Sequence, residues 1–193
     1  MSRTIRDLVE ERSVQIVGRT AEKAALLGTL EEGGPLVAFV HGIAGVGKST
    51  LLEAFADEAR ALGATVVRID CRSIEPTERG FLAGLGGAVG GAPRSAQEAV
   101  ERLARLGERV VLVLDTYEVL RLLDSWVRQV FAPSLRDNTR LVVAGREPPV
   151  ASWYATPGWS ELARAAFGSG ISMRVRPRNF WRERTSTPPT PGG

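Results

Sequence analysis

Short apolar runs alternate along the chain with segments whose apolar residues recur at helical spacing. The runs at 35–40 and 110–114 contain no polar residue, which is typical of strands that are buried on both faces of a sheet. Two further runs, at 64–70 and 140–145, also predict strands. Because strands that alternate with helices form parallel sheets covered on both sides, the pattern predicts a three-layer α/β domain with a mostly parallel central sheet.

The segments between these strands predict helices. Thr20 is placed to cap a first helix, which stops before the Gly-Gly-Pro sequence at 33–35. A second helix follows the first strand and ends at Gly63, a residue type common just beyond helix C-termini. Ser95 and Glu98 match a capping box at the start of a third helix.

The remaining segments have less regular patterns. Six glycines between residues 80 and 91 argue against a long helix there. Residues 160–166 predict a short helix, and residues 171–175 are the candidate for a fifth strand. The aromatic residues 153, 154 and 159 favour packing over a base-stacking platform. One helix after the third strand is expected to bury a face that comprises Val119, Leu122, Leu123, Trp126, Val127 and Val130.

Composition places the chain among ordinary globular proteins. It has 193 residues, of which 44% are apolar and 24% charged, enough for one sizeable domain. No apolar run approaches the roughly 18 residues of a membrane helix, and the acidic N-terminal residues are unlike a signal peptide. The single cysteine, Cys71, excludes an internal disulfide and a Cys-rich metal site. We therefore expect a cytoplasmic protein with no membrane partner.

The basic charge is concentrated near the C-terminus. Residues 171–193 contain five arginines and one glutamate, which gives this segment a charge of +4. Because the whole chain has a net charge of +3, residues 1–170 together have a charge of −1. Nucleic-acid binding is therefore unexpected for the body of the protein and weak at most through the tail. We expect an N-terminal segment at 1–13, a domain at 14–166, and an Arg- and Pro-rich disordered tail at 167–193.

The sequence at 42–49 satisfies the pattern G-x-x-x-x-G-K-[ST] between a predicted strand and a predicted helix. Its glycines let successive N–H groups surround phosphate oxygens, and the following helix N-terminus adds its positive dipole end. Lys48 is expected to reach the β- and γ-phosphates, and the Ser49 hydroxyl to bind Mg²⁺. The residues expected to contact ATP or ADP here are Gly42, Ile43, Ala44, Gly45, Val46, Gly47, Lys48, Ser49 and Thr50.

Asp115 ends the most apolar predicted strand, at the sheet edge where the phosphate-binding loop begins. It is a candidate Mg²⁺ ligand, and a helix N-cap role is a compatible alternative. Its neighbour is Thr116, where many P-loop ATPases have a second acid, so Glu118 is the nearest candidate general base. Alternatively, Glu118 is a first-turn glutamate favoured by the helix dipole.

Arg146 follows the fourth strand at the same predicted edge. Its guanidinium can sense or stabilise the γ-phosphate, or form a surface ion pair. For His41, between strand and loop, we expect a packing or backbone-bonding role rather than chemistry.

The segments 16–22, 42–49, 112–118 and 141–146 together resemble the ATPase module of the STAND class. These signal-transduction ATPases are related to AAA+ proteins and to the replication-initiator-like AAA ATPase domain. The resemblance covers residues 14–165 and implies an ASCE-type P-loop NTPase fold. It also implies that Val17, Gly18 and Arg19 lie beside the adenine, that Asp115 is the Walker B acid, and that Arg146 is the sensor-1 residue.

The same resemblance predicts an ATP-binding regulatory switch that hydrolyses ATP slowly or not at all and acts through a protein partner or self-association. Such modules continue into a helical lid and a winged-helix domain, for which the remaining residues leave no room, so we expect a truncated or frame-altered module. Two alternatives are a P-loop small-molecule kinase, with its acceptor pocket formed by residues 72–94, and a nucleotide-dependent nucleic-acid-binding protein.

Overall fold

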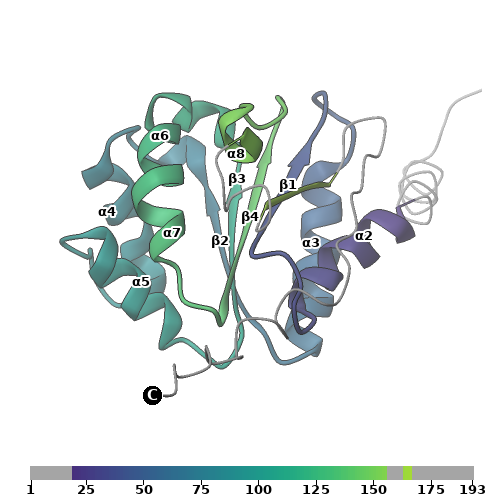
Figure 1. Ribbon diagram of the computed structural model, residues 1–193, viewed down its shortest axis with the longest axis horizontal. Coiled ribbons are helices and arrows are strands. Elements are labelled where there is room, and N and C mark those ends of the chain that lie inside the picture. The colour runs from purple at the N-terminus through teal and green to yellow at the C-terminus, as the bar shows by residue number, and fades with distance from the viewer. Residues whose placement is uncertain (1–18, 156–162, 167–193) are drawn as a thin grey trace, which may run out of the picture.

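The computed structural model describes residues 19–155 and 163–166. The N-terminal segment at 1–13, the candidate strand at 171–175 and the Arg- and Pro-rich tail lie outside the described residues. The described chain folds as helices packed on a central sheet (Figure 1).

Five parallel strands form the sheet in the order β2-β3-β4-β1-β5. The strands are β1 (Val37–His41), β2 (Thr65–Asp70), β3 (Val110–Asp115), β4 (Thr139–Gly145) and β5 (Ala163–Ala166). Because β4 lies between β1 and β3, the strand order is that of the ASCE-type P-loop NTPases. The predicted fold class is therefore confirmed.

Helices cover both faces of the sheet, which gives the predicted three layers (Figure 1). One face carries α2 (Thr20–Leu27), the 3-10 turn η1 (Gly28–Leu30) and α3 (Lys48–Ala61). The other face carries α4 (Glu78–Val89), α5 (Ala96–Ala104), α6 (Asp124–Trp126), α7 (Ala132–Ser134) and α8 (Ser152–Ala155). The elements between these are the 3-10 segments η2 (Cys71–Ser73) and η3 (Tyr117–Leu123) and the π-helical segment η4 (Val127–Phe131).

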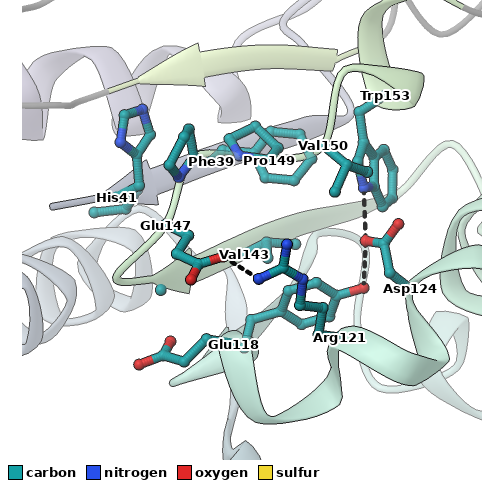
Figure 2. Close-up of a pocket in the computed structure, with 14 residues that line it drawn as sticks. Phe39, His41, Glu118, Arg121, Asp124, Val143, Glu147, Pro149, Val150 and Trp153 are labelled. Carbon is teal, nitrogen blue, oxygen red and sulfur yellow. Dashed lines mark hydrogen bonds and ion pairs between the residues drawn. The ribbon is translucent and has the colours of Figure 1, made fainter.

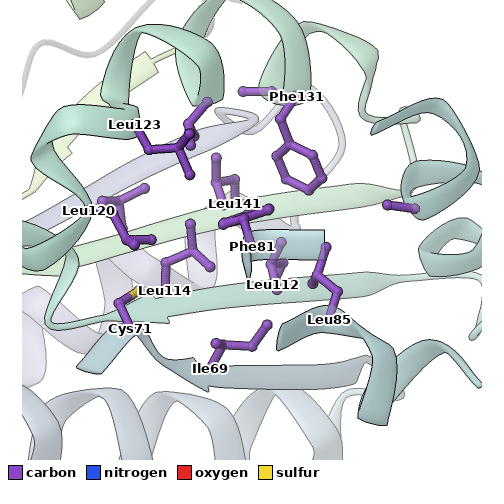
Figure 3. Close-up of a cluster of buried hydrophobic side chains, with 14 of the residues drawn as sticks. Ile69, Cys71, Phe81, Leu85, Leu112, Leu114, Leu120, Leu123, Phe131 and Leu141 are labelled. Carbon is purple, nitrogen blue, oxygen red and sulfur yellow. The ribbon is translucent and has the colours of Figure 1, made fainter. Parts of the chain in front are cut away.

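Two hydrophobic clusters, one on each face, join the layers. In the larger cluster Phe81 and Phe131 are fully buried, and their rings meet edge to face at a centroid distance of 4.8 Å (Figure 3). Phe55 of α3 is buried in the smaller one. Every residue of β3 is buried, and its alternate side chains enter both clusters, Leu112 the larger and Val113 the smaller. This confirms the expectation of a strand buried on both faces.

The segment after β3 differs from the single helix that the sequence predicts. Leu122 is 91% exposed, whereas Leu120 and Phe131 are fully buried. The reason is local geometry, since η3 is a 3-10 helix with about three residues per turn and η4 is π-helical. A pattern of apolar residues read with about 3.6 residues per turn therefore predicts the wrong buried face along this segment. Of the expected face, the structure buries Leu123 and Val127 and exposes Val119, Leu122 and Val130.

A 12-residue helix, α4, forms where the glycines argued against one. These glycines are needed because neighbouring backbone approaches closely. A Cβ on Gly80 would lie 2.3 Å from the Glu75 carbonyl oxygen, and one on Gly86 would lie 2.9 Å from the Ala92 nitrogen. The helix also has an N-cap, since Thr77 Oγ1 accepts the Gly80 N–H at 3.0 Å. The close packing and the cap outweigh the low helix propensity.

Residues 163–166 form a strand, so the helix predicted at 160–166 is wrong there. Ala163 pairs with Val37 and Ala166 with Val40 along the outer edge of β1. That edge offers backbone N–H and C=O groups which need partners, and pairing with them overrides the helix propensity of an alanine-rich segment.

The predicted helix starts are confirmed in position, with different capping details. α2 begins at Thr20, but its N-cap residue is Arg19. α5 begins after Ser95, whose Oγ accepts the Glu98 N–H at 3.2 Å. The Glu98 carboxylate reaches back to the N–H of Arg94, at 2.7 Å, one residue before the position of a standard capping box.

Candidate functional site

Three strand ends meet at the carboxyl edge of the sheet. The predicted phosphate-binding loop begins after β1 at Gly42, Asp115 ends β3, and Arg146 follows β4. The β1–β4 register pairs His41 with Gly145, so the loop and Arg146 leave the sheet from neighbouring positions. The structure therefore brings the loop, the candidate metal ligand and the candidate sensor to one edge, as the sequence predicts.

Residues 42–47 form an irregular loop between β1 and α3. Gly45 and Gly47 have φ values of 77° and 83°, in the left-handed region that favours glycine. Gly47 is also the N-cap of α3, so the loop leads directly into a helix start whose first N–H groups have no carbonyl partner within the helix. Ser49 and Thr50 are exposed on that first turn. This is a backbone arrangement suited to an anion.

Lys48 is the first residue of α3, and its side chain folds back over the loop. Its Nζ donates to the carbonyl oxygens of Gly42, at 2.7 Å, and of Ile43, at 3.0 Å. Burial lowers the pKa of Lys48, while the nearby charges of Glu118 and Asp115 act to raise that pKa. The ammonium group thus lies within electrostatic range of both carboxylates.

Arg19 is the N-cap residue of α2 and lies against the phosphate-binding loop. Its guanidinium donates to the carbonyl oxygen of Val46, and its Cζ lies 4.0 Å from the position of a Cβ on Gly47. The side chain therefore contacts the phosphate-binding loop itself. Val17 and Gly18, which the resemblance places beside the adenine together with Arg19, lie outside the described residues.

Asp115 is engaged on both carboxylate oxygens. Oδ2 accepts from Nη2 of Arg68 at 2.6 Å, and Oδ1 accepts from the N–H of Thr116 at 2.8 Å. The Asp115 side chain is 13% exposed and that of Arg68 is 34% exposed, so the carboxylate is shielded while the guanidinium is partly open to water. The alternative role as a helix N-cap is not what the structure shows, because the N-cap of η3 is Thr116.

Glu118 occupies the first turn of η3 and pairs with Arg146. Its Oε1 lies 3.2 Å from Nε of Arg146, and its Oε2 accepts the Arg146 backbone N–H at 3.1 Å. The Glu118 side chain is 20% exposed and that of Arg146 is 66% exposed. The two predicted residues therefore lie together. The alternative structural roles, a first-turn glutamate for Glu118 and a surface ion pair for Arg146, also describe this contact.

Glu118 also lines an apolar slot of about 50 Å³ (Figure 2). Phe39, Pro149 and Val150 line it, and at its mouth Nη1 of Arg121 lies 2.7 Å from Oε2 of Glu147. His41 also lines the slot, and partial burial lowers its pKa.

At the inner end of the slot, Asp124 forms a buried hydrogen-bonded centre (Figure 2). Its Oδ1 accepts from the hydroxyl of Tyr117 at 3.1 Å and from Nε1 of Trp153 at 2.9 Å. Trp153 is fully buried and meets Phe39 edge to face at 5.0 Å. The expectation of a packing role is confirmed for Trp153, while Trp159 lies outside the described residues.

The donor set at this edge fits Mg²⁺. Ser49 offers a hydroxyl and Asp115 a carboxylate, the hard oxygen ligands that this ion prefers. Among the residues that the structure describes, no group of three or more His, Cys, Asp or Glu side chains is placed to hold a metal by itself.

Sequence reasoning missed two features of this site. Arg68 was not identified, although its position two residues before the end of β2 places it beside the end of β3 once those strands pair. The Tyr117–Asp124–Trp153 cluster was also missed. Its members are 7 and 29 residues apart in the chain, and no local pattern links them.

The sequence matches the family described as AAA ATPase domain over residues 15–144. The chain belongs to this family. The family is one of nucleotide-binding P-loop ATPases that typically use Mg²⁺, and the match includes the loop at 42–49. No curated protein matches the sequence.

Solved structures similar to this AAA ATPase domain include Drosophila ORC bound to AT-rich DNA and Cdc6, with 17% identity and a TM-score of 0.49 over 85% of this chain. Another is Aeropyrum pernix ORC1 in complex with DNA, with 21% identity and a TM-score of 0.49 over 76% of this chain. The chain spans 61% and 44% of the lengths of these two proteins.

Within the described residues, no helix of this AAA ATPase domain has the length and apolar character needed to cross a bilayer.

Proposed function

We propose that this AAA ATPase domain is a regulatory switch of the STAND class, which binds Mg-ATP and ADP and hydrolyses ATP slowly. The observation that carries the proposal is the position of Lys48. Its ammonium group lies over a glycine loop at a helix start and within electrostatic range of Asp115 and Glu118. A cation, amide donors and two carboxylates at one sheet edge are the elements that phosphoryl transfer requires.

In this proposal the loop amides and Lys48 bind the phosphates, and Ser49 and Asp115 hold the metal, which neutralises phosphate charge when bound. Arg19, which already contacts the loop at Val46, lies beside the adenine together with Val17 and Gly18. Glu118 accepts a proton from the attacking water. The assignment of Arg19 follows from the resemblance, whereas Glu118 is assigned because it is the nearest candidate base to Asp115 in the sequence.

Slow hydrolysis is proposed because arginines engage both carboxylates. Glu118 is poorly placed to accept a proton while Arg146 holds both of its oxygens. A γ-phosphate carries more negative charge than a carboxylate, so it competes for the exposed Arg146 guanidinium. If Arg146 moves from Glu118 to the γ-phosphate, Glu118 becomes free to act as the base. Because ADP has no γ-phosphate, the position of Arg146 would differ between the ATP-bound and ADP-bound states. The output passes to a protein partner or to a second copy of the chain.

The proposal is tested on the full chain by titration calorimetry with ATP and ADP in the presence of Mg²⁺, together with phosphate release over time. We expect both nucleotides to bind and phosphate release to be slow without any acceptor. Absence of binding by folded protein would refute the proposal, and rapid turnover would refute the slow switch.

The same measurements separate the alternatives. A small-molecule kinase binds ATP but transfers phosphate only when an acceptor is supplied. A nucleic-acid-binding protein would show nucleotide-dependent affinity for DNA, whereas weak electrostatic attraction of the basic C-terminal residues to DNA is lost as salt rises. Phosphate release that rises with a small acceptor, or DNA binding that survives about 200 mM salt, would therefore favour those functions over the switch.

A further inference from the structure

Thr116 has a strained backbone at the centre of the site. Its φ of 59° and ψ of 41° place it in the left-handed region, and among the described residues it is the only non-glycine with positive φ. This region is sterically disfavoured for a β-branched residue. Thr116 lies directly between Asp115 and Tyr117, so its conformation determines how the chain turns from the end of β3 into η3.

Contacts on both sides oppose relaxation of this turn. On one side the Thr116 N–H donates to Oδ1 of Asp115 at 2.8 Å. On the other, the Tyr117 hydroxyl donates to Oδ1 of Asp124 at 3.1 Å. Burial, and then the charge of Asp124, raise the pKa of Tyr117, so the hydroxyl remains a donor at neutral pH.

Asp124, which anchors the Tyr117 hydroxyl, is itself held by residues from other parts of the fold. Nε1 of Trp153 on α8 donates to the same Asp124 oxygen (Figure 2). Nε of Arg128 lies 3.8 Å from the other oxygen. Asp124 is 8% exposed and Trp153 is fully buried. A buried carboxylate with two donors and a cation nearby has little freedom to move.

We propose that Tyr117 is a positioning residue of the site: anchored on Asp124, it holds Thr116 in its left-handed conformation and thereby fixes Glu118 relative to Asp115. The catalytic part of this inference rests on the proposed function, in which Glu118 is the general base. The geometric part does not. Without the anchor, Thr116 relaxes toward negative φ and η3 shifts together with Glu118.

Three variants of the full chain test the inference: Tyr117→Phe, Thr116→Gly, and the double variant. Tyr117→Phe removes only the hydroxyl. Thr116→Gly makes positive φ unstrained, so the turn no longer needs an anchor. Phe131→Leu is the control, because it alters a buried aromatic of the same core outside the hydrogen-bonded cluster. Amide hydrogen exchange of residues 116 and 119 is followed by NMR, with Leu112 of β3 reporting global stability.

We expect Tyr117→Phe to accelerate exchange at residues 116 and 119 about tenfold relative to Leu112. It should lower ATP turnover by about ten- to a hundredfold, with the Kd for ATP unchanged within about twofold. Adding Thr116→Gly should restore both, and Phe131→Leu should change neither. Unchanged exchange in Tyr117→Phe, or no rescue by Thr116→Gly, would overturn the inference. If the wild type binds ATP but does not turn it over, proposed hydrolysis fails, whereas the exchange data still decide whether Tyr117 holds the turn.

Discussion

The guanidinium of Arg68, on the edge strand β2, lies 2.6 Å from the carboxylate of Asp115 at the end of β3. The pairing follows from the register, which sets Asp70 opposite Asp115 and leaves Arg68 two residues back along β2. Asp115 is the proposed Mg²⁺ ligand, and its carboxylate is largely buried. Arg68 and the metal therefore compete for the same carboxylate.

Replacing Arg68 should lower the Mg²⁺ concentration that nucleotide binding requires. In Arg68→Ala the Asp115 carboxylate loses its cation, so we expect the Mg²⁺ concentration for half-maximal ATP binding to fall about threefold or more. The control is Arg72→Ala, which removes the exposed ion pair with Asp70 nearby. Mg²⁺ titrations at fixed ATP measure the shift. A higher Mg²⁺ requirement in Arg68→Ala would mean that Arg68 supports the site rather than competing at it.

Glu118→Gln should separate binding from hydrolysis. Glutamine keeps an oxygen that can accept the Arg146 N–H but is a very weak base, so we expect turnover to fall about a hundredfold and ATP affinity to stay within about threefold. Glu147→Gln is the matched control, because Glu147 is also ion-paired at this edge, with Arg121. Phosphate release and calorimetry on both variants give the answer. Equal turnover in wild type and Glu118→Gln would remove Glu118 from the role of base.

Two leucines of η3 provide a sharp test of the packing behind the site. Leu120 is fully buried and Leu122 is 91% exposed, although the apolar periodicity places Leu122 on the buried face. We expect Leu120→Ala to lower the free energy of unfolding by about 2–5 kcal/mol and Leu122→Ala to change it by less than about 0.5 kcal/mol. Urea denaturation of both variants measures the difference. Similar losses in the two would place η3 in another register.

The fold was predictable where one physical requirement dominated. A strand with five consecutive apolar residues can only be central, and a glycine loop between a strand and a helix has few other uses, so β3 and residues 42–49 were recognisable. Local reasoning failed where tertiary contacts decide. The close approach of Glu75 to Gly80 makes α4 glycine-rich, and the open edge of β1 turns an alanine-rich segment into β5.

The site was predictable to a similar extent. Parallel strands end at a common edge, so the meeting of Lys48, Asp115, Glu118 and Arg146 could be inferred from the order of elements alone. The partners of these residues could not be. Arg68 reaches Asp115 only through the β2–β3 register, and Asp124 reaches Trp153 only through the packing of α6 and α8. Such contacts depend on three-dimensional packing that apolar periodicity does not encode.

Cys71 should be unreactive in the folded protein. Burial, followed by the charges of Asp70, Asp115 and Glu118, raises the pKa of its thiol to about 12. At pH 8 only about one thiol in ten thousand would then be ionised, and the thiolate is the reactive form. We expect no reaction with Ellman's reagent at pH 8 until urea unfolds the chain, which has no other cysteine.

The same shift gives a pH dependence of stability with a defined sign. The unfolded thiol ionises near about pH 8.5 and the folded one only near about 12, so stability from this group is complete below 8.5 and falls as pH rises toward 12. Denaturation midpoints measured between pH 7 and 11, for wild type and Cys71→Ala, should converge as pH rises. Rapid labelling of the native thiol, or a constant difference between the midpoints, would contradict burial of Cys71.

The most direct test compares ATP binding by Lys23→Ala and Lys48→Ala, which replace the only two lysines of the chain. Lys23 pairs with Glu58 at 2.6 Å, between α2 and α3, and serves as the matched control. Calorimetry with Mg-ATP should show binding by the wild type and by Lys23→Ala, and a loss of at least about tenfold in affinity for Lys48→Ala. Equal affinity in the two variants, with circular dichroism showing both to be folded, would contradict nucleotide binding at this loop.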